Sequence, residues 1–419
     1  MKKSYPIKWY IPILTIDDKK RMVKGVKEFK EVERMKQYIH AAQFFFTSGV
    51  KTGGYLAIID GKFGEYVENR PNDGEIIEYP NSWIAPGLVD THIHGYKNHD
   101  VMDNDANGIQ IMSEALLECG VTSFLPTTLT SSRERLLAVA KTVGEVATQV
   151  KGAKIPGIYF EGPFFTEKYK GAQNPNYFSD PSLEVFHEWQ AASGNLIKKI
   201  ALAPEREGVE AFVEALTKEG VVVALGHSDA TYEQARKAID AGASVFVHAF
   251  NGMRGFTHRE LGMAGAMLNI KEVFAELIAD GHHVHPKAVE LLIHSIGYEK
   301  VALITDCMMA GGMPDGDYIL GEFPVKVANG TARLKEGNLA GSILKLYQGM
   351  QNVVKWGIAT PYQAVMMASY IPAVSCNIAD VCGEIRKGRA ADFIVLDQQM
   401  NLQATYLDGV QRYAVKENK

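Results

Sequence analysis

The sequence predicts an α/β fold in which a (β/α)8 barrel of the TIM type is joined to a smaller β domain. The first observation behind this prediction is a regular alternation of short apolar runs and helical segments from about residue 84 onwards, which is typical of parallel βα units. The second is that strand-like segments without helices lie before and after this alternation. The third is the length of 419 residues, which fits a barrel of about 250 residues and one smaller module.

The first 34 residues differ in composition from the rest of the chain. The segment Lys19–Arg34 is dense in charge and offers little that could build a core. Strand-like sequence starts at Met35, so we expect residues 1–34 to be a dispensable extension. The codons for residues 30–34 could contain a purine-rich ribosome-binding sequence, which would make Met35 the native start. The alternative is a helix over Asp17–Gln37 that lies on the barrel surface.

Strand-like segments near both ends of the chain predict one small sheet domain. A hairpin is expected at Asp60 and Gly61, because this dipeptide favours a tight turn between antiparallel strands. Both groups of segments flank the alternating part of the chain, so we expect them to meet in space. The expected strand segments are Tyr38–Phe46, Gly54–Lys62 and Ile76–Ile84 at the amino end, and Gly383–Gly388 and Ala391–Leu396 at the carboxyl end.

The central part of the chain predicts the barrel. Each expected strand is an apolar run with the length of a strand that is buried on both faces. One helix is expected to begin at Thr231 with a capping box to Gln234 and to stop at Gly242. The expected strands include Val121–Thr128, Ile200–Pro204, Val273–Ala279 and the runs that end near residues 92, 161, 227, 248 and 306, and the expected helices include Asn107–Glu118, Arg133–Val150 and Gly208–Lys218.

Six residues of metal-ligating type stand at the ends of these apolar runs. His92 and His94 are two residues apart, so a strand would point both side chains to the same side. Barrel enzymes carry their chemistry at the carboxyl ends of the strands, and imidazole is the commonest metal ligand. A single such histidine is more often an ordinary interior residue, but five strands that end this way favour a metal site. The six residues are His92, His94, Glu161, His227, His248 and Asp306.

The composition excludes several classes of function. The net charge of −5 leaves no basic excess for binding nucleic acid or a membrane surface. No apolar run reaches the roughly 20 residues that cross a bilayer, and the amino end lacks a signal peptide's apolar region and cleavage site. Cys119, Cys307, Cys376 and Cys382 have no Cys-x-x-Cys spacing, so we expect a reducing cytoplasm. Cys307, next to Asp306, is expected to be a packing residue and not a nucleophile.

The segments that carry a resemblance to a known family are Pro86–Gly95, Glu161–Phe164, Gly226–Ala230, His248–Met253, His258–Glu260, Asp280–His283, Thr305–Asp306 and Leu339–Ser342. On these segments the chain resembles the amidohydrolase superfamily, and within it the N-acetylglucosamine-6-phosphate deacetylases. The segments keep the order found in that family, and the resemblance runs from about Met35 to the carboxyl end. It implies a small β-sandwich built from residues 35–88 and 376–419, with a catalytic barrel over residues 89–375.

The resemblance implies metal-dependent hydrolysis of the acetamide of N-acetyl-D-glucosamine 6-phosphate, which gives D-glucosamine 6-phosphate and acetate. Glu161, His227 and His248 would hold the principal divalent metal. His92 and His94 would hold a second one, with Glu161 able to bridge the two ions. Nitrogen and oxygen ligands suit zinc, iron or manganese, so one or two ions of these kinds are expected per chain.

The resemblance makes Asp306 the catalytic acid and base. A divalent ion lowers the pKa of its water from about 15.7 towards ~7 and polarises a carbonyl. Asp306 could take the proton of the attacking water and pass it to the amine as the C–N bond breaks. Such general acid–base help contributes roughly 10²–10⁴-fold to a rate.

The resemblance also implies a set of residues that line a sugar-phosphate pocket. Arg259 would bind the phosphate, because a guanidinium offers a planar fork to phosphate oxygens. It would reach in from the neighbouring subunit of a homodimer. The other implied pocket residues are Ala172, Gln173, Asn251, Gly252, Asp280, His283, Leu339, Ala340 and Gly341.

Three positions depart from the family pattern. Gln173 stands where some relatives carry histidine, Leu261 replaces the usual proline, and Thr257 replaces a second histidine. Two alternatives therefore stay open: a deacetylase for N-acetylgalactosamine 6-phosphate, or another amidohydrolase such as a cyclic-amide hydrolase. A non-catalytic scaffold on the same fold is the alternative from a different class, but scaffolds usually lose ligands and this chain keeps them.

Overall fold

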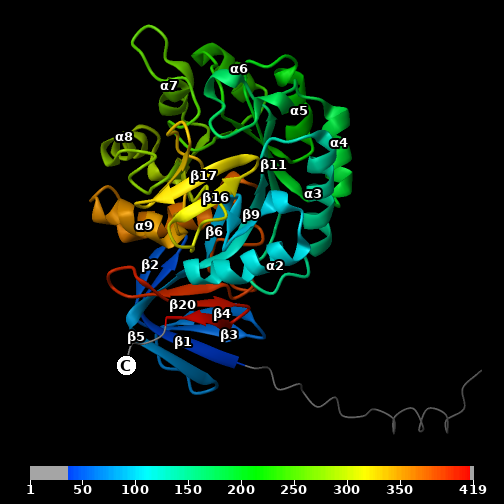
Figure 1. Cartoon of the computed structure of the whole chain (residues 1–419). Coiled ribbons are helices and arrows are strands. Elements are labelled where there is room, and N and C mark those ends of the chain that lie inside the picture. Colours follow the sequence, from blue (N-terminus) through cyan, green and yellow to red (C-terminus); the bar gives the residue numbers. More distant parts are fainter. Residues whose placement is uncertain (1–35, 416–419) are drawn as a thin grey trace, which may run out of the picture.

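A parallel eight-stranded sheet forms the body of the molecule in the computed structural model, which describes residues 36–415 (Figure 1). Each strand pairs with the next one along the chain. The first and last strands meet through a parallel bridge between Ile93 and Cys307, where the Asp306 N–H donates to the His92 carbonyl at 2.8 Å. The predicted barrel is confirmed, and its strands are β6 (Leu88–Ile93), β9 (Val121–Thr128), β10 (Ile158–Phe164), β11 (Ile197–Leu202), β12 (Val222–Leu225), β13 (Val245–Phe246), β14 (Phe274–Ile278) and β15 (Val301–Ile304).

Helices connect most of the barrel strands and cover the outside of the barrel (Figure 1). The helix after β12 begins with the predicted capping box between Thr231 and Gln234. The helix from Arg133 ends at Val146, before the expected Val150, because the chain turns where the Gln149 N–H bonds to the Val146 carbonyl. The helices are α2 (Ala106–Ala115), α3 (Arg133–Val146), α4 (Leu183–Ala192), α5 (Val209–Lys218), α6 (Tyr232–Asp240), α7 (Gly262–Asn269), α8 (Pro286–Ile296), α9 (Leu346–Lys355), α10 (Pro361–Ala368) and α11 (Tyr370–Ser375).

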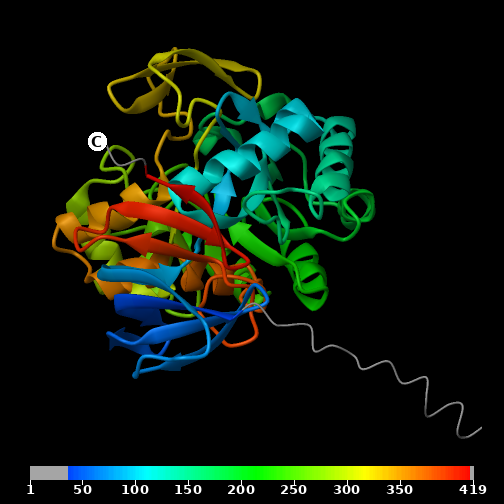
Figure 2. The ribbon, with the colours of Figure 1, turned by 90° about the horizontal axis from the view of Figure 1, so that it is seen from below.

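A second eight-stranded sheet joins the two ends of the chain. Its central contact is the antiparallel pairing of β5 with β19, and β1 pairs with β5 in parallel. Figure 2 shows these strands from both ends of the chain stacked beside the barrel. Aromatic side chains from both ends share one core, in which the Phe63 ring from the amino end lies against the Phe393 ring from the carboxyl end with centroids 6.2 Å apart. The strands are β1 (Lys36–Phe46), β2 (Gly49–Thr52), β3 (Tyr55–Ile59), β4 (Lys62–Val67), β5 (Glu75–Pro86), β19 (Phe393–Leu396), β20 (Leu402–Leu407) and β21 (Val410–Ala414).

One expected strand is wrong. Residues 383–388 form bends and turns, not a strand. Gly383 and Gly388 both have positive φ angles, 88° and 84°, and this left-handed conformation interrupts an extended backbone. Ile385 is nevertheless buried against the second sheet, which explains why the segment carries apolar character without strand structure.

A small three-stranded antiparallel sheet follows the last barrel strand and was not expected. It consists of β16 (Gly316–Leu320), β17 (Phe323–Ala328) and β18 (Thr331–Leu334). Figure 2 shows this sheet in dark yellow, projecting from the rest of the molecule. Buried and exposed residues alternate along β17, with Val325 and Val327 buried and Pro324 and Lys326 exposed, so one face of this sheet packs on the protein and the other meets solvent.

The expectations for residues 1–34 lie outside the described residues. Lys36 and Gln37 belong to β1, so the alternative helix does not reach Gln37. Of the helices within residues 36–415, none combines the length and apolar character that crossing a membrane requires.

Candidate active site

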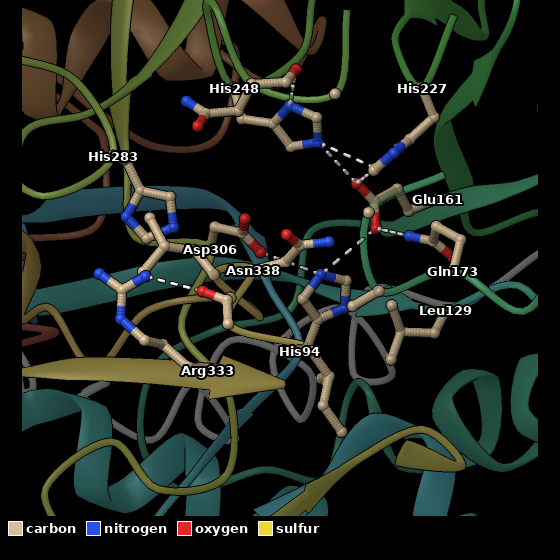
Figure 3. A pocket seen from close by; sticks show the side chains of 18 residues that line it. His94, Leu129, Glu161, Gln173, His227, His248, His283, Asp306, Arg333 and Asn338 are labelled. Atoms are coloured by element: carbon tan, nitrogen blue, oxygen red, sulfur yellow. Dashed lines mark hydrogen bonds and ion pairs between the residues drawn. The ribbon is translucent and has the colours of Figure 1, made fainter. Parts of the chain in front are cut away.

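A pocket of about 420 Å³ opens at the carboxyl ends of the barrel strands. Side chains from several strand ends point into it, as the sticks in Figure 3 show. Leu320 and Asn338 reach the same pocket from the three-stranded sheet and the loop that follows it. The predicted site residues that line the pocket are His94, Glu161, Ala172, Gln173, His227, His248, Asn251, Gly252, His283, Asp306, Leu339 and Gly341.

One cluster of buried ligand-type atoms consists of Glu161, His227 and His248. Oε1 of Glu161 lies 3.3 Å from Nε2 of His227 and 3.2 Å from Nε2 of His248. The two Nε2 atoms are 3.1 Å apart. Glu161 lies within β10, while His227 and His248 follow the carboxyl ends of β12 and β13. Barrel closure thus brings together residues that are distant in sequence.

A second cluster consists of His92, His94 and Asp306. Nε2 of His94 lies 3.1 Å from Oδ1 of Asp306, and Nε2 of His92 lies 3.6 Å from the same oxygen. Glu161 stands between the clusters, because its two carboxylate oxygens lie 3.4 Å from His92 Nε2 and 3.4 Å from His94 Nε2. The six residues predicted as metal ligands and catalytic acid therefore form one continuous group.

In each of the four histidines, Nδ1 contacts an oxygen outside the group and Nε2 faces its centre. A carbonyl oxygen accepts and cannot donate, so an imidazole nitrogen beside it must carry the proton. The opposite nitrogen, Nε2, then presents a lone pair, and a protonated Nε2 is not required anywhere in the group. The Nδ1 contacts are the Tyr169 carbonyl for His227 at 3.0 Å, the Asn251 carbonyl for His248 at 3.1 Å, the Thr127 carbonyl for His94 at 3.2 Å and the Glu276 carboxylate for His92 at 2.9 Å.

Lone pairs and carboxylates that converge without a donor between them fit a divalent cation. Nε2 of His92 is a buried atom with no hydrogen-bond partner among the described residues. Four imidazole nitrogens and two carboxylates are a donor set of the nitrogen and oxygen type that suits zinc, iron and manganese. The described residues of this pocket could thus hold one or two metal ions.

The acids of the group are ionised at neutral pH. Burial raises the pKa of Asp306, but His92 and His94 outweigh burial and lower the pKa to about 2. Burial likewise raises the pKa of Glu161, and the surrounding histidines hold it well below its usual range. Burial lowers the pKa of His92, while Asp306, Glu161 and Glu276 raise it to about 10. The carboxylates thus favour positive charge at this point, which a proton on His92 supplies and which a divalent ion would supply in its place.

The backbone turns sharply where these side chains leave the strands. His227, His248 and Asp306 have φ angles of 46°, 29° and 49°, a left-handed conformation that is uncommon outside glycine and concentrates at functional sites. Gly252 also has a positive φ of 58°, and a Cβ atom there would lie 2.9 Å from Nδ1 of His227. Only glycine lets the backbone pass this close to the imidazole.

The remaining predicted residues divide into those at the pocket and those away from it. Gln173 is buried, its amide nitrogen donates to Oε2 of Glu161, and its amide oxygen accepts from the Thr130 N–H at 2.9 Å. Asp280 lies behind His283 and contacts its Nδ1 at 2.6 Å. Ala340 is buried beside the lining residues.

Arg259 does not line the pocket of the described chain. It lies in the exposed segment 255–259 before α7. The structure describes a single chain, so the predicted contribution of Arg259 to a neighbouring subunit stays a prediction.

The comparison with protein families decides the assignment. The sequence model of the amidohydrolase family matches residues 83–412. The chain belongs to the amidohydrolase family. The resemblance found in the sequence is thereby confirmed, and the protein is a hydrolase.

Curated relatives and solved structures place this amidohydrolase among the amino-sugar phosphate deacetylases. It is 41% identical over 327 residues to the N-acetylglucosamine-6-phosphate deacetylase of Vibrio furnissii, covering 78% of this chain and 82% of the relative. It is 36% identical over 376 residues to the N-acetylgalactosamine-6-phosphate deacetylase of Escherichia coli O157:H7, covering 90% and 99%. A mutant N-acetyl-D-glucosamine-6-phosphate deacetylase from Mycobacterium smegmatis, in complex with N-acetyl-D-glucosamine-6-phosphate, matches with a TM-score of 0.84 and 29% identity, covering 90% and 99%.

Sequence reasoning missed three charged residues of this amidohydrolase. Arg333, on β18, is the one arginine among the residues that line the pocket within the described part of the chain. No sequence signal pointed to Arg333, because the strand that carries it was not expected. Lys199 and Glu276 lie fully buried behind His92. A lysine and a glutamate inside apolar strand runs were a signal that could have found them.

Proposed function

We propose that this amidohydrolase removes the acetyl group of N-acetyl-D-glucosamine 6-phosphate to give D-glucosamine 6-phosphate and acetate. The observation that carries the proposal is Glu161 between two buried histidine clusters, with Asp306 in contact with one of them. A pocket of about 420 Å³ leaves room for a phosphorylated sugar beside these groups. The names of the relatives support the choice of substrate.

Glu161, His227 and His248 would hold the principal ion, and His92 and His94 would hold a second one with Glu161 between them. The Nδ1 contacts support these roles, because they leave each Nε2 free to coordinate. When bound, a divalent ion would activate water at neutral pH and polarise the acetyl carbonyl. Zinc, iron and manganese all suit this donor set.

Asp306 would move the proton in this reaction. Its carboxylate is ionised, because its pKa is lowered to about 2, so it is ready to accept a proton from the attacking water. As the C–N bond breaks, Asp306 returns that proton to the departing nitrogen, and the products are an amine and acetate. Oδ1 of Asp306 lies 3.1 Å from Nε2 of His94, so this carboxylate stands directly beside the proposed metal ligands.

The sugar would be oriented by groups on the pocket wall. Asp280 holds the ring of His283 through Nδ1, which leaves the opposite edge for a sugar hydroxyl. Gly252 brings its backbone close to the reacting region. The other wall residues that would contact substrate are Ala172, Gln173, Asn251, Leu339, Ala340 and Gly341.

Two arginines are candidates for the phosphate. Arg333 lines the pocket from the same chain. Arg259, in the exposed segment before α7, would arrive from the partner in a homodimer. A guanidinium binds phosphate in a planar, charge-assisted arrangement, and both residues offer it. We also propose a cytoplasmic location, which the four free cysteines of the chain support.

The galacto epimer is the second candidate substrate. The relative from Escherichia coli O157:H7 is named for N-acetylgalactosamine 6-phosphate, and the match covers 99% of its length. The two substrates differ only in the configuration at C4, so the metal group and Asp306 would serve both.

Acetate release from the two epimers tests the proposal. Purified protein is supplied with zinc, iron or manganese in turn, and acetate and free amine are measured together with the metal content of the same sample. We expect a kcat/KM that favours the gluco epimer. A higher kcat/KM for the galacto epimer would transfer the assignment to the second candidate. Stoichiometric metal without acetate from either epimer would point to another amide substrate, and no bound metal would point to a scaffold.

A further inference from the structure

A chain of three charged or polar side chains crosses the barrel interior beneath the metal-ligand group. Lys199 from β11 forms an ion pair with Oε1 of Glu276 from β14, and Oε2 of Glu276 lies 2.9 Å from Nδ1 of His92 on β6. All three side chains are completely buried, with 0% exposure. Lys199 and Glu276 sit on strands separated by β12 and β13, so the pair spans the inside of the barrel.

The polar atoms of these three side chains all have partners, with one exception. The Lys199 ammonium also donates to the Thr91 carbonyl at 3.0 Å and lies 3.6 Å from the centre of the Tyr159 ring. Glu276 uses one oxygen for Lys199 and the other for His92. The exception is Nε2 of His92, which is buried, lacks a hydrogen-bond partner among the described residues and faces Glu161 and Asp306.

An ion pair at this position needs a reason, because barrel interiors are normally filled by branched aliphatic side chains. Removing two charges from water costs stability, and well-packed apolar residues often replace a buried pair without loss. The reason lies in the partner of Glu276. Among the four histidines of the site, His92 is the one whose Nδ1 meets a carboxylate, while the other three meet backbone carbonyls.

We propose that Glu276, with its charge balanced by Lys199, is a positioning residue that prepares His92 to hold the second metal ion. The carboxylate fixes the proton of His92 on Nδ1, orients the ring and makes Nε2 a stronger electron donor. Lys199 contacts the other oxygen of this carboxylate and so helps to hold it against Nδ1 of His92. The inference rests on the proposed role of His92 as a ligand.

The same contacts could serve only to link β11 and β14 structurally. Measurement of metal affinity distinguishes this structural role from the positioning role. Glu276→Gln keeps the shape but weakens the acceptor for Nδ1. The matched control is Asp392→Asn, since Asp392 is a buried carboxylate that pairs with Lys154 at 2.8 Å and contacts none of the six ligand residues. Zinc is titrated into the metal-free variants against a chromophoric chelator, which resolves a tight and a weak binding step.

We expect Glu276→Gln to weaken the second binding step by about 10–100-fold and to leave the first step unchanged. Asp392→Asn should leave both steps unchanged even if it lowers the melting temperature. Lys199→Met together with Glu276→Gln removes both charges and allows the barrel to pack. This double variant should fold and still show the weakened second step.

Three results would overturn the inference. The first is an unchanged second step in Glu276→Gln, or in the double variant, when the wild type binds two ions, because the pair then has only the structural role. The second is equal weakening of both steps, which indicates general damage to the site. The third is a wild type that binds a single ion, and this result removes the proposed second metal site as well. The wild-type titration thus separates failure of the proposed function from failure of the positioning role alone.

Discussion

Nε2 of His227 lies 3.1 Å from Nε2 of His248, although the Nδ1 atom of each ring is next to a backbone carbonyl. Both rings therefore present lone pairs to each other across this short distance. Two lone pairs repel, and Oε1 of Glu161, within 3.3 Å of each Nε2, adds negative charge. A bound cation would remove this repulsion, so we expect metal binding and the stability of the folded protein to be coupled.

Removal of the metal should lower the melting temperature as well as the activity. A ligand that binds only the folded state at about 100 times its Kd adds about 2.7 kcal/mol of stability. We expect chelator treatment to lower the melting temperature by several degrees and added zinc or manganese to restore it. Scanning calorimetry of the metal-free and reloaded protein measures the effect. Equal melting temperatures would contradict the coupling.

Substitution of ligands should distinguish the two clusters. His227→Ala should empty the principal site and abolish acetate release. Changing His92 and His94 together to alanine should lower the metal content from about two ions per chain to about one, because these residues contact Asp306 and Glu161 but not His227. Elemental analysis of the purified variants gives the count. An unchanged count in the double variant would remove both residues from the ligand set.

The barrel could be predicted because the alternation of buried strands and capped helices can be recognised from short stretches of sequence. Buried parallel strands are continuous apolar runs, and helices with caps follow them, as at Thr231. The three-stranded sheet was missed because its short strands alternate exposed and buried residues and follow the last barrel strand without a helix. The segment 383–388 was wrongly expected to be a strand because its buried Ile385 imitates one, while the positive φ of its glycines bends the chain.

The ligand group could be predicted because barrel strands deliver their ends to one place. Glu161 and Asp306 therefore lie next to His92, regardless of the conformation of the loops. The partners of these residues could not be predicted, because they depend on which strands lie opposite each other inside the closed barrel. Glu276 reaches His92 across the barrel, and Arg333 reaches the pocket from the missed sheet. Neither relationship leaves a trace in local periodicity.

Asp306→Asn should keep the fold and the metal but lower kcat by about 10²–10⁴-fold, the usual contribution of general acid–base help. The amide cannot accept a proton from water and return it to nitrogen. Acetate release under saturating substrate measures the loss, and metal content with melting temperature shows that the site remains formed. Activity within about tenfold of the wild type would exclude Asp306 as the proton carrier.

Gln173→Ala should weaken metal binding, because the Gln173 amide donates to Oε2 of Glu161 and fixes that carboxylate. Loss of such a partner typically lowers metal affinity by about 10–100-fold. Gln190→Ala is the control, since Gln190 also bonds through both ends of its amide, to the backbone of Ile197 at 2.9 and 3.0 Å, away from the pocket. Chelator competition compares them. Equal affinity in both variants would leave Gln173 only a substrate contact.

Arg333→Ala should raise KM for the phosphorylated sugar and spare any slow activity on unphosphorylated N-acetylglucosamine. A hydrogen bond to a charged group contributes about 1.5–3 kcal/mol, so KM should rise by about tenfold or more. Arg236 is an exposed arginine on α6 paired with Asp240, so Arg236→Ala is the matched control and should change the KM for neither substrate.

Arg259→Ala should give the same selective loss if a partner subunit supplies Arg259, and mixing this variant with Asp306→Asn should recover activity in mixed dimers. Equal loss on both substrates in Arg333→Ala would mean that Arg333 shapes the three-stranded sheet and does not bind phosphate.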